Sequence, residues 1–216
     1  MDKILRGVEH FRRFVFPKQR ELFAALSSSQ QPAALFVTCS DSRIHPDLIT
    51  QSSPGDLFIL RNPGNLIPAY SPGPASTDAT IEFAIDVLHI AHIIVCGHSD
   101  CGAMKALLNR DDTRHLPAVT AWLEHAESTL RVLAASVDSP ADPLERLDKA
   151  SRINVMLQLD NLRTHPSVAA ALQRGELQLH AWHYDIPTGE VTEFDAATSQ
   201  FVPVSAPRDA VERGTR

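Results

Sequence analysis

The sequence predicts an α/β domain with a mostly parallel central sheet flanked by helices. Three short apolar runs, at residues 33–39, 57–60 and 92–96, predict strands that are buried on both faces. Gly, Pro or Asn residues bound these runs, and stretches of helical spacing separate them. Strands that alternate with helices pair in parallel, and we expect helices on both faces of the sheet.

The remaining elements follow from spacing and from start and stop signals. Residues 3–28 predict a helix that breaks at Pro17, and the apolar spacing from Ile81 to Leu88 predicts another after the start signal at 76–78. Helices are also predicted at 101–108, 116–135 and 144–172, the last interrupted before Pro166, and a loop is predicted around 138–143. Two further strands, at 177–184 and 191–194, are predicted to be joined by a turn.

Length and composition fit one globular domain. The chain has 216 residues, of which 44% are hydrophobic and 21% charged. We assign residues 1–216 to this domain, with a helical arm at 1–30 and a frayed polar tail at 204–216.

Charge and hydropathy exclude several partner classes. The net charge is −6, so there is no basic surplus to bind nucleic acid. No apolar run approaches the roughly 18 residues of a membrane helix, so we expect no membrane partner. Charges interrupt the first 14 residues, which do not resemble a signal peptide, and three cysteines are too few for a disulfide framework. We therefore expect a cytoplasmic protein.

Two cysteines and one histidine stand where predicted strands end. Cys39 closes the first strand, His98 follows the third, and Cys101 comes three residues later at a helix start. Ligands gather beyond the carboxyl ends of parallel strands, so these side chains can meet. They would give Zn²⁺ three protein ligands and leave a fourth position open, as in catalytic sites. The alternative is a packed cysteine and a loop histidine.

A carboxylate and a guanidinium follow the first of these cysteines. Asp41 would reach the fourth metal position, and Arg43 can hold Asp41 ionised through a charge-assisted pair. The alternative is a surface Asp–Arg pair that caps the next element.

Three ordered motifs resemble the β-class carbonic anhydrases: Cys-Ser-Asp-Ser-Arg at 39–43, Arg-Asn-Pro-Gly-Asn at 61–65 and Gly-His-Ser-Asp-Cys-Gly at 97–102. The resemblance runs from about residue 10 to about residue 203. It is closest to the bacterial branch that includes the carbonic anhydrase of cyanate-degradation operons. It implies reversible hydration of CO2 to bicarbonate, in which zinc hydroxide attacks CO2 in an apolar pocket.

The resemblance also implies a role for individual residues. Cys39, His98 and Cys101 would hold one Zn²⁺ per subunit, and Asp41 and Arg43 would be the catalytic dyad, with Asp41 as a fourth ligand in a closed form. The implied substrate pocket contains Gln30 as a hydrogen-bond donor, Phe58 as an apolar wall from a partner subunit, Gly102 as backbone beside the substrate, and Phe83 where relatives often have Tyr. The N-terminal helices would pack on a partner, giving a homodimer or a dimer-based oligomer.

Two departures from the family pattern change expectations. Pro63 removes a backbone N–H and stiffens its loop. Some relatives bind bicarbonate at a second, inhibitory site through Trp, Arg and Tyr. Arg61 and Tyr184 match two of these residues, but Phe36 replaces the Trp and supplies no indole donor, which argues against that site. With Phe36 present, we predict that Asp41 stays paired with Arg43 at neutral pH.

Other assignments stay open. The same zinc site could serve a hydrolase of CS2 or COS, or a structural or sensor protein without activity, and Cys39 and Cys101 could instead form a redox pair. Cys96 is predicted to be a buried strand residue. The remaining histidines considered are predicted to be packed or on the surface: His45, His92, His165 and His183.

Overall fold

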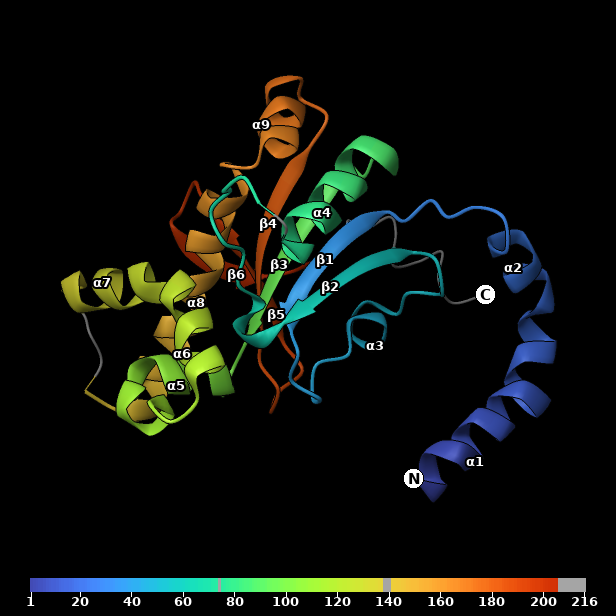
Figure 1. Cartoon of the computed structure of the whole chain (residues 1–216), viewed down its shortest axis with the longest axis horizontal. Coiled ribbons are helices and arrows are strands. Elements are labelled where there is room, and N and C mark those ends of the chain that lie inside the picture. The colour runs from blue at the N-terminus through green and yellow to red at the C-terminus, as the bar shows by residue number, and fades with distance from the viewer. Residues whose placement is uncertain (74, 138–140, 206–216) are drawn as a thin grey trace.

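A computed structural model describes residues 1–73, 75–137 and 141–205 of the chain. Its centre is a six-stranded sheet in the order β2-β1-β3-β4-β5-β6 (Figure 1). The strands are β1 (Ala34–Cys39), β2 (Leu57–Asn62), β3 (His92–His98), β4 (Gln178–Tyr184), β5 (Val191–Asp195) and β6 (Gln200–Pro203). The first four strands pair in parallel, and β5 and β6 add antiparallel pairs. The predicted α/β class and mostly parallel sheet are confirmed.

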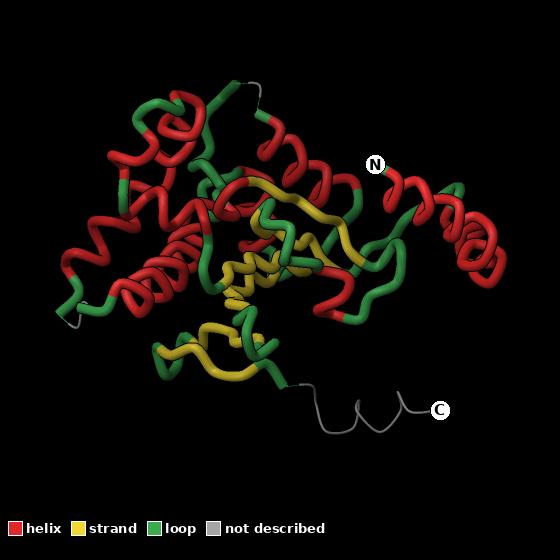
Figure 2. Tube along the Cα trace, turned by 90° about the horizontal axis from the view of Figure 1, so that it is seen from below, coloured by secondary structure: helices red, strands yellow, loops and turns green. Residues whose placement is uncertain are grey.

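Helices pack on one face of the sheet, whereas the apolar cluster on its other face consists of strand residues among the described part of the chain. The long helix α8 (Pro143–Leu162) packs on β3 and β4, and α4 (Ser76–Glu82) and α9 (Pro166–Gln173) lie beside it over the same apolar cluster. Figure 2 shows most of the helices, in red, gathered on one side of the yellow strands. The core they enclose is wholly aliphatic at its centre, with Leu35 and Ile93 fully buried. Burying such side chains stabilises the domain by roughly 1.5–3 kcal/mol for each.

A second apolar cluster lies beyond the carboxyl ends of β1 and β3. It is formed by helices α5 (Gly102–Leu108), α6 (Pro117–Leu123) and α7 (Glu127–Ala135), together with the start of α8. The predicted helix at 116–135 is therefore two α-helices joined by a short 3₁₀ turn at Glu124–Ala126. The predicted interruption before Pro166 is confirmed, because α8 ends at Leu162 and α9 begins at Pro166.

The first 26 residues form a helical arm that stands apart from the sheet (Figure 1). Helix α1 (Asp2–His10) continues through a π-helical turn to Val15, and α2 spans Arg20–Leu26. The predicted break at Pro17 takes the form of a 3₁₀ segment at Phe16–Gln19, because Pro at a first helical position needs no N–H. No residue of these segments is buried within the chain.

Some predictions differ from the structure, and others concern residues that the structure does not describe. β2 was expected to be buried on both faces, but it is the edge of the sheet and its side chains alternate in exposure. Helix α3 (Pro46–Thr50) and strand β6 are too short to show a sequence period and were not predicted. In the predicted tail, residues 206–216 lie outside the described residues, as do residues 138–140 of the predicted loop.

Among the described helices, none combines the length and the apolar character that a bilayer crossing requires.

Helix α8 packs so closely on β3 that there is no room for a side chain at Gly97. A Cβ atom at this position would come within 2.5 Å of Val155 Cγ2 and 3.1 Å of Ser151 Oγ. We expect Gly97→Ala to lower the free energy of unfolding by about 1–3 kcal/mol, because a packed interface resists added volume. Urea denaturation measures this loss.

A double-mutant cycle with Val155→Ala provides the control, since that change removes the atom that would clash. The double variant should be more stable than the sum of the two single losses predicts. Strict additivity would show that the contact between β3 and α8 does not limit residue 97.

Candidate metal centre

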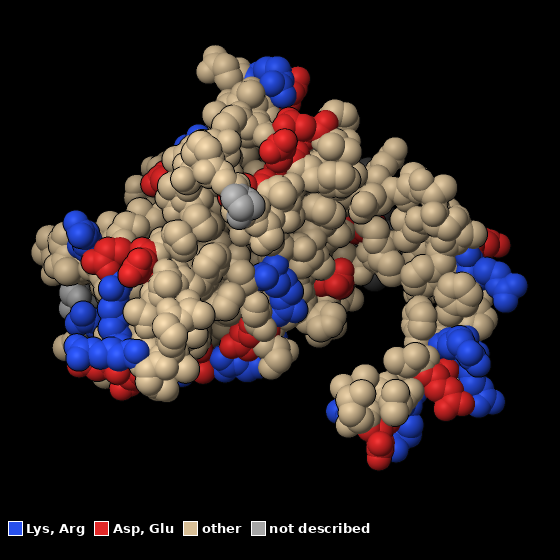
Figure 3. Space-filling view, in the orientation of Figure 1, with Lys and Arg blue, Asp and Glu red and all other residues tan. Residues whose placement is uncertain are grey.

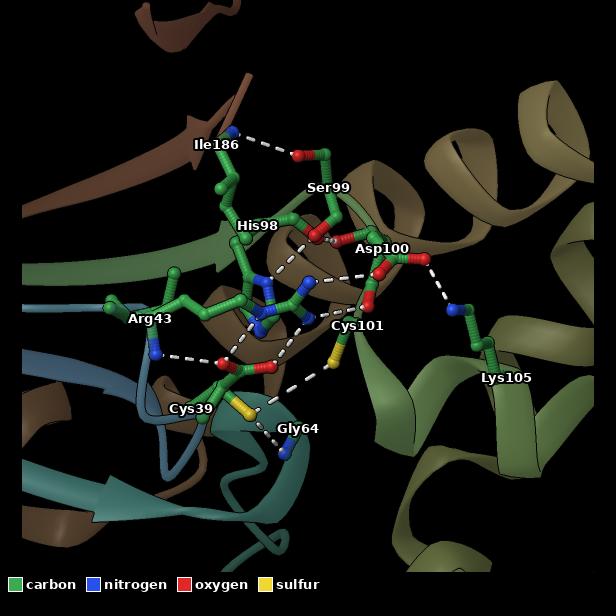
Figure 4. A network of polar contacts seen from close by, with 12 residues as sticks. Cys39, Arg43, Gly64, His98, Ser99, Asp100, Cys101, Lys105 and Ile186 are labelled. Atoms are coloured by element: carbon green, nitrogen blue, oxygen red, sulfur yellow. Dashed lines mark hydrogen bonds and ion pairs between the residues drawn. The ribbon is translucent and has the colours of Figure 1, made fainter. Parts of the chain in front are cut away.

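Three buried side chains converge at the switch point of the sheet, between the carboxyl ends of β1 and β3. Cys39 is the last residue of β1, His98 is the last residue of β3, and Cys101 is the residue before α5. Their ligand atoms all lie within 4.8 Å of one another, and the two sulfur atoms are 4.0 Å apart. No other group of three or more potential ligands of this kind occurs among the described residues. Figure 4 shows the two thiols directed toward one another beside the imidazole.

The histidine of this group has one nitrogen without a partner. His98 Nδ1 lies 2.9 Å from the Ser99 carbonyl oxygen, which accepts its hydrogen bond and so leaves Nε2 as a lone-pair donor. His98 is fully buried, and Nε2 has no hydrogen-bond partner among the described residues. Leaving a buried polar atom unpaired is costly, and a cation between the two thiols would satisfy it.

The pKa values of the two thiols shift in opposite directions. A hydrogen bond from Cys101 lowers the pKa of Cys39 against the opposing effect of burial, and the Gly64 N–H, 3.3 Å from the Cys39 sulfur, lowers it further. The same bond, together with burial, raises the pKa of Cys101. Cys39 is therefore the more acidic of the two thiols, and a bound cation would displace the protons that remain on the pair.

Asp41 and Arg43 form a two-pronged ion pair beside the thiols. Arg43 donates from Nε to Asp41 Oδ1 at 3.0 Å and from Nη2 to Oδ2 at 2.7 Å, and its backbone N–H also reaches Oδ1. These hydrogen bonds hold the pKa of Asp41 well below its usual range. The carboxylate therefore stays ionised, and the pairing expected from the sequence is present in the structure.

Arg61 fixes the loop that carries this pair. Its guanidinium donates to the carbonyl oxygens of Cys39, Asp41 and Ile44 at 2.7–3.1 Å. In the family pattern Arg61 matches a residue of the second, inhibitory bicarbonate site of some relatives. Its donors are instead used on main-chain oxygens, and Phe36 is fully buried in an edge-on contact with Trp182.

The segment between β2 and α4 is braced by buried amide side chains. Gly64, whose N–H meets Cys39, has φ +80°, and a Cβ there would lie 3.0 Å from Ala103. From α8, Asn154 donates to the Gly64 carbonyl, while Gln158 accepts from Ile67 N–H at 2.7 Å. A backbone segment outside helices and strands needs such partners, because its N–H and C=O groups lack the regular hydrogen bonds of a helix or sheet.

The predicted pocket residues are not gathered at this centre within one chain. Phe58 pairs in register with Leu35, four residues before Cys39, so it lies about 13 Å along the sheet from the thiols. It contacts Phe83, with ring centroids 6.0 Å apart. Gln30 is exposed and lines a surface hollow with Leu26, Ser28, Ser29 and Gly55. Of the predicted pocket residues, Gly102 alone adjoins the metal group, as the first residue of α5.

The remaining predicted cysteine and histidines are packed or on the surface. Cys96 is fully buried, and burial raises its pKa to about 12. His165 is buried with Nε2 3.1 Å from the Pro68 carbonyl oxygen, His45 is exposed, and His92 hydrogen-bonds His180 across the sheet. None of them belongs to the group around Cys39.

The comparisons with known proteins agree with this geometry. The family model described as "Carbonic anhydrase" matches residues 34–191. The chain is 46% identical to a carbonic anhydrase of Pseudomonas aeruginosa, over 95% of this chain and 92% of the relative. It is also 46% identical to carbonic anhydrase 1 of Escherichia coli O157:H7, over 95% and 93%.

Solved structures give the same result. The β-carbonic anhydrase CcaA superimposes with a TM-score of 0.91 at 42% identity, covering 94% of this chain and 99% of that one. A tetrameric β-carbonic anhydrase of Sordaria macrospora gives a TM-score of 0.80 at 27% identity, over 94% and 98%.

One buried histidine outside the metal group predicts a pH dependence of stability. Burial lowers the pKa of His183 to about 4, with the nearby Arg152 adding to the effect. A histidine with a folded-state pKa below its unfolded value of about 6.5 contributes full stability above pH 6.5, and this is lost as the pH falls toward 4. We expect His183→Gln to reduce the loss of unfolding free energy between pH 7 and pH 5 by about 2 kcal/mol.

Urea denaturation of the wild type and the variant at both pH values measures this difference. His183→Ala repeats the test with a smaller side chain, in case glutamine packs poorly. If both variants lose as much stability as the wild type between pH 7 and pH 5, burial of His183 does not set this dependence.

Proposed function

Because the chain belongs to the β class of the carbonic anhydrase family, we propose that it catalyses the zinc-dependent, reversible hydration of CO2 to bicarbonate and a proton. The observation that carries this proposal is the buried group of Cys39, His98 and Cys101 with the Asp41–Arg43 pair beside it. This arrangement places three potential metal ligands and an ionised carboxylate, two residues after Cys39, at the same end of the sheet.

Zinc suits the donors that the chain offers. Two thiols and an imidazole are the ligand types that Zn²⁺ selects, and the unpartnered Nε2 of His98 is the atom the ion would engage. Cys39, His98 and Cys101 would hold one Zn²⁺ per chain and leave a fourth position for a small molecule. When bound there, Zn²⁺ would lower the pKa of a coordinated water and so supply a nucleophile for CO2.

The dyad would orient that nucleophile. An ionised Asp41 is an acceptor only, so it can take a hydrogen bond from the attacking group and direct a lone pair toward carbon. Arg43 donates two hydrogen bonds to Oδ1, from Nε and from its backbone N–H, and one to Oδ2, so Oδ2 keeps a lone pair for a further donor. Because Arg43 also keeps Asp41 charged, the acceptor is present throughout the neutral pH range.

A second copy of the chain would complete the pocket. Gln30, Phe58 and Phe83 lie away from the thiols of their own chain, so we propose that they line the site of a partner. The arm supports this assembly, because Leu5, Val8 and Phe14 are 58%, 62% and 53% exposed. Figure 3 shows the N-terminal part of the arm standing clear of the body of the chain. An amphipathic helix with nothing against its apolar face is unstable alone in water.

The first prediction of this proposal concerns Asp41. Zinc-loaded protein should hydrate CO2 in a stopped-flow assay between pH 6.5 and 9, with a rate that rises through one alkaline pKa. Asp41→Asn should lower kcat/KM about 100-fold or more while zinc content is unchanged, because the amide presents an N–H where an acceptor is needed.

A parallel assay with CS2 and COS separates the related hydrolase activities from this one. Activity on CS2 or COS without CO2 hydration would replace the proposal with the hydrolase. Bound zinc without any of these activities would indicate a structural or sensor role. Thiols that react equally with and without a chelator would indicate a redox pair, because zinc-bound thiolates are protected.

A further prediction concerns the arm. Leu5→Glu with Val8→Glu should shift the protein toward monomer in analytical ultracentrifugation, because two charges would be buried in the interface. Arg6→Glu on the same helix is the matched control and should leave the oligomer intact. CO2 hydration should fall together with the dimer, since the pocket would lose its partner residues. An unchanged oligomer in the double variant would contradict the role of the arm.

A further inference from the structure

Asp100 makes two contacts with Arg43 of the dyad. Its carboxylate Oδ2 accepts from Arg43 Nη1 at 2.9 Å, and its carbonyl oxygen accepts from Arg43 Nη2 at 3.1 Å. Arg43 and Asp100 are 57 residues apart in the sequence. Figure 4 shows Asp100 between Arg43 and Lys105, immediately before Cys101.

These contacts use the side of the guanidinium that Asp41 leaves open. Asp41 binds Nε and Nη2, while Asp100 binds Nη1 and shares Nη2. A guanidinium held on one edge can still swing about its side-chain bonds. One that is held at all three nitrogens has a single orientation, because its donors lie in one rigid plane.

Asp100 is itself held in place. Its other carboxylate oxygen pairs with Lys105, one turn into α5. Its backbone has φ +58°, the left-handed region that non-glycine residues seldom occupy. A residue held in such a conformation beside a reactive group indicates a functional constraint. Arg43 and Asp100 are both close to half exposed, so the pair adds little to folding stability, and its effect is on geometry.

We propose that Asp100 is a positioning residue of the carbonic anhydrase reaction, which fixes the guanidinium of Arg43 so that Arg43 holds Asp41 in its working orientation. This inference rests on the proposed function and deepens it. Asp100 touches neither substrate nor metal in this scheme and acts only through Arg43. Orientation of this kind matters because small misplacements of a catalytic group cost large factors in rate.

Two substitutions at this position separate the side-chain contact from the backbone conformation. Asp100→Gly removes the carboxylate and accepts the left-handed backbone without strain. Asp100→Asn also tolerates that backbone and keeps an oxygen that can accept from Arg43 Nη1. Ser199→Gly is the matched control, since Ser199 is another left-handed residue, with φ +55°, in an exposed turn before β6.

The experiment measures kcat/KM for CO2 hydration, zinc content, and the ¹⁵N NMR signal of Arg43 Nε–H. We expect Asp100→Gly to lower kcat/KM about tenfold, Asp100→Asn to stay within about threefold of the wild type, and Ser199→Gly to match the wild type. Zinc content should be equal in all four proteins. In Asp100→Gly the Arg43 signal should shift and exchange faster with solvent, while Asp100→Asn should retain the wild-type signal.

Several results would overturn the inference. These are an unchanged kcat/KM in Asp100→Gly, an asparagine variant as impaired as the glycine variant, or a loss of zinc that accounts for the loss of rate. If the wild type itself does not hydrate CO2, the proposed function fails separately. The Arg43 signal then still decides whether Asp100 positions this side chain.

Discussion

The parallel pairing of β1 and β3 is the constraint on which the rest of the site depends. Leu35 to Thr38 run in register with Ile93 to Cys96, so both strands reach the same edge of the sheet together. That register brings Cys39 to His98 across 59 residues of sequence. The helix that follows β3 begins at Gly102, and the residue before it, Cys101, supplies the third candidate ligand. A shift of one residue in either strand would turn these side chains to opposite faces.

The loops at this end of the sheet lack the backbone hydrogen bonds of a strand or helix, and side chains hydrogen-bond their main-chain groups instead. Arg61 holds the segment after β1 through three main-chain carbonyls, and Asn62 holds its own loop by bonds to both the N–H and the carbonyl of Leu66. The amides of α8 do the same from the other side. The result is a rigid cradle in which Gly64 N–H can meet a thiolate and Arg43 can meet Asp41. Rigid support of this kind is what a preorganised site requires.

We propose one explanation for both the arm and the metal group. One chain places its ligands and its dyad at one end of the sheet, while Phe58, Phe83 and Gln30 lie elsewhere. The same chain leaves the apolar side of α1 without cover. Both features make sense if the working unit contains two chains, because association would bury the arm and bring the missing pocket residues to the site.

The sequence by itself determined the local elements and the donor atoms. The apolar runs that end at Cys39 and Cys96 predicted strands, and the position of His98 and Cys101 just beyond the second run predicted the metal group. These signals are local, since they depend on spacing and on residues that end a strand or begin a helix. The pairing of Asp41 with Arg43 is local as well, because only two residues separate them.

Only the tertiary structure decided which distant groups share a contact. That β2 is an edge strand follows from the strand order, which the apolar run at 57–60 does not encode. The role of Arg61 and the contact between Asp100 and Arg43 depend on loops that the register of two strands brings together. Charged side chains with several possible partners give no periodic signal. Their partners are chosen by where the packed sheet and helices leave them.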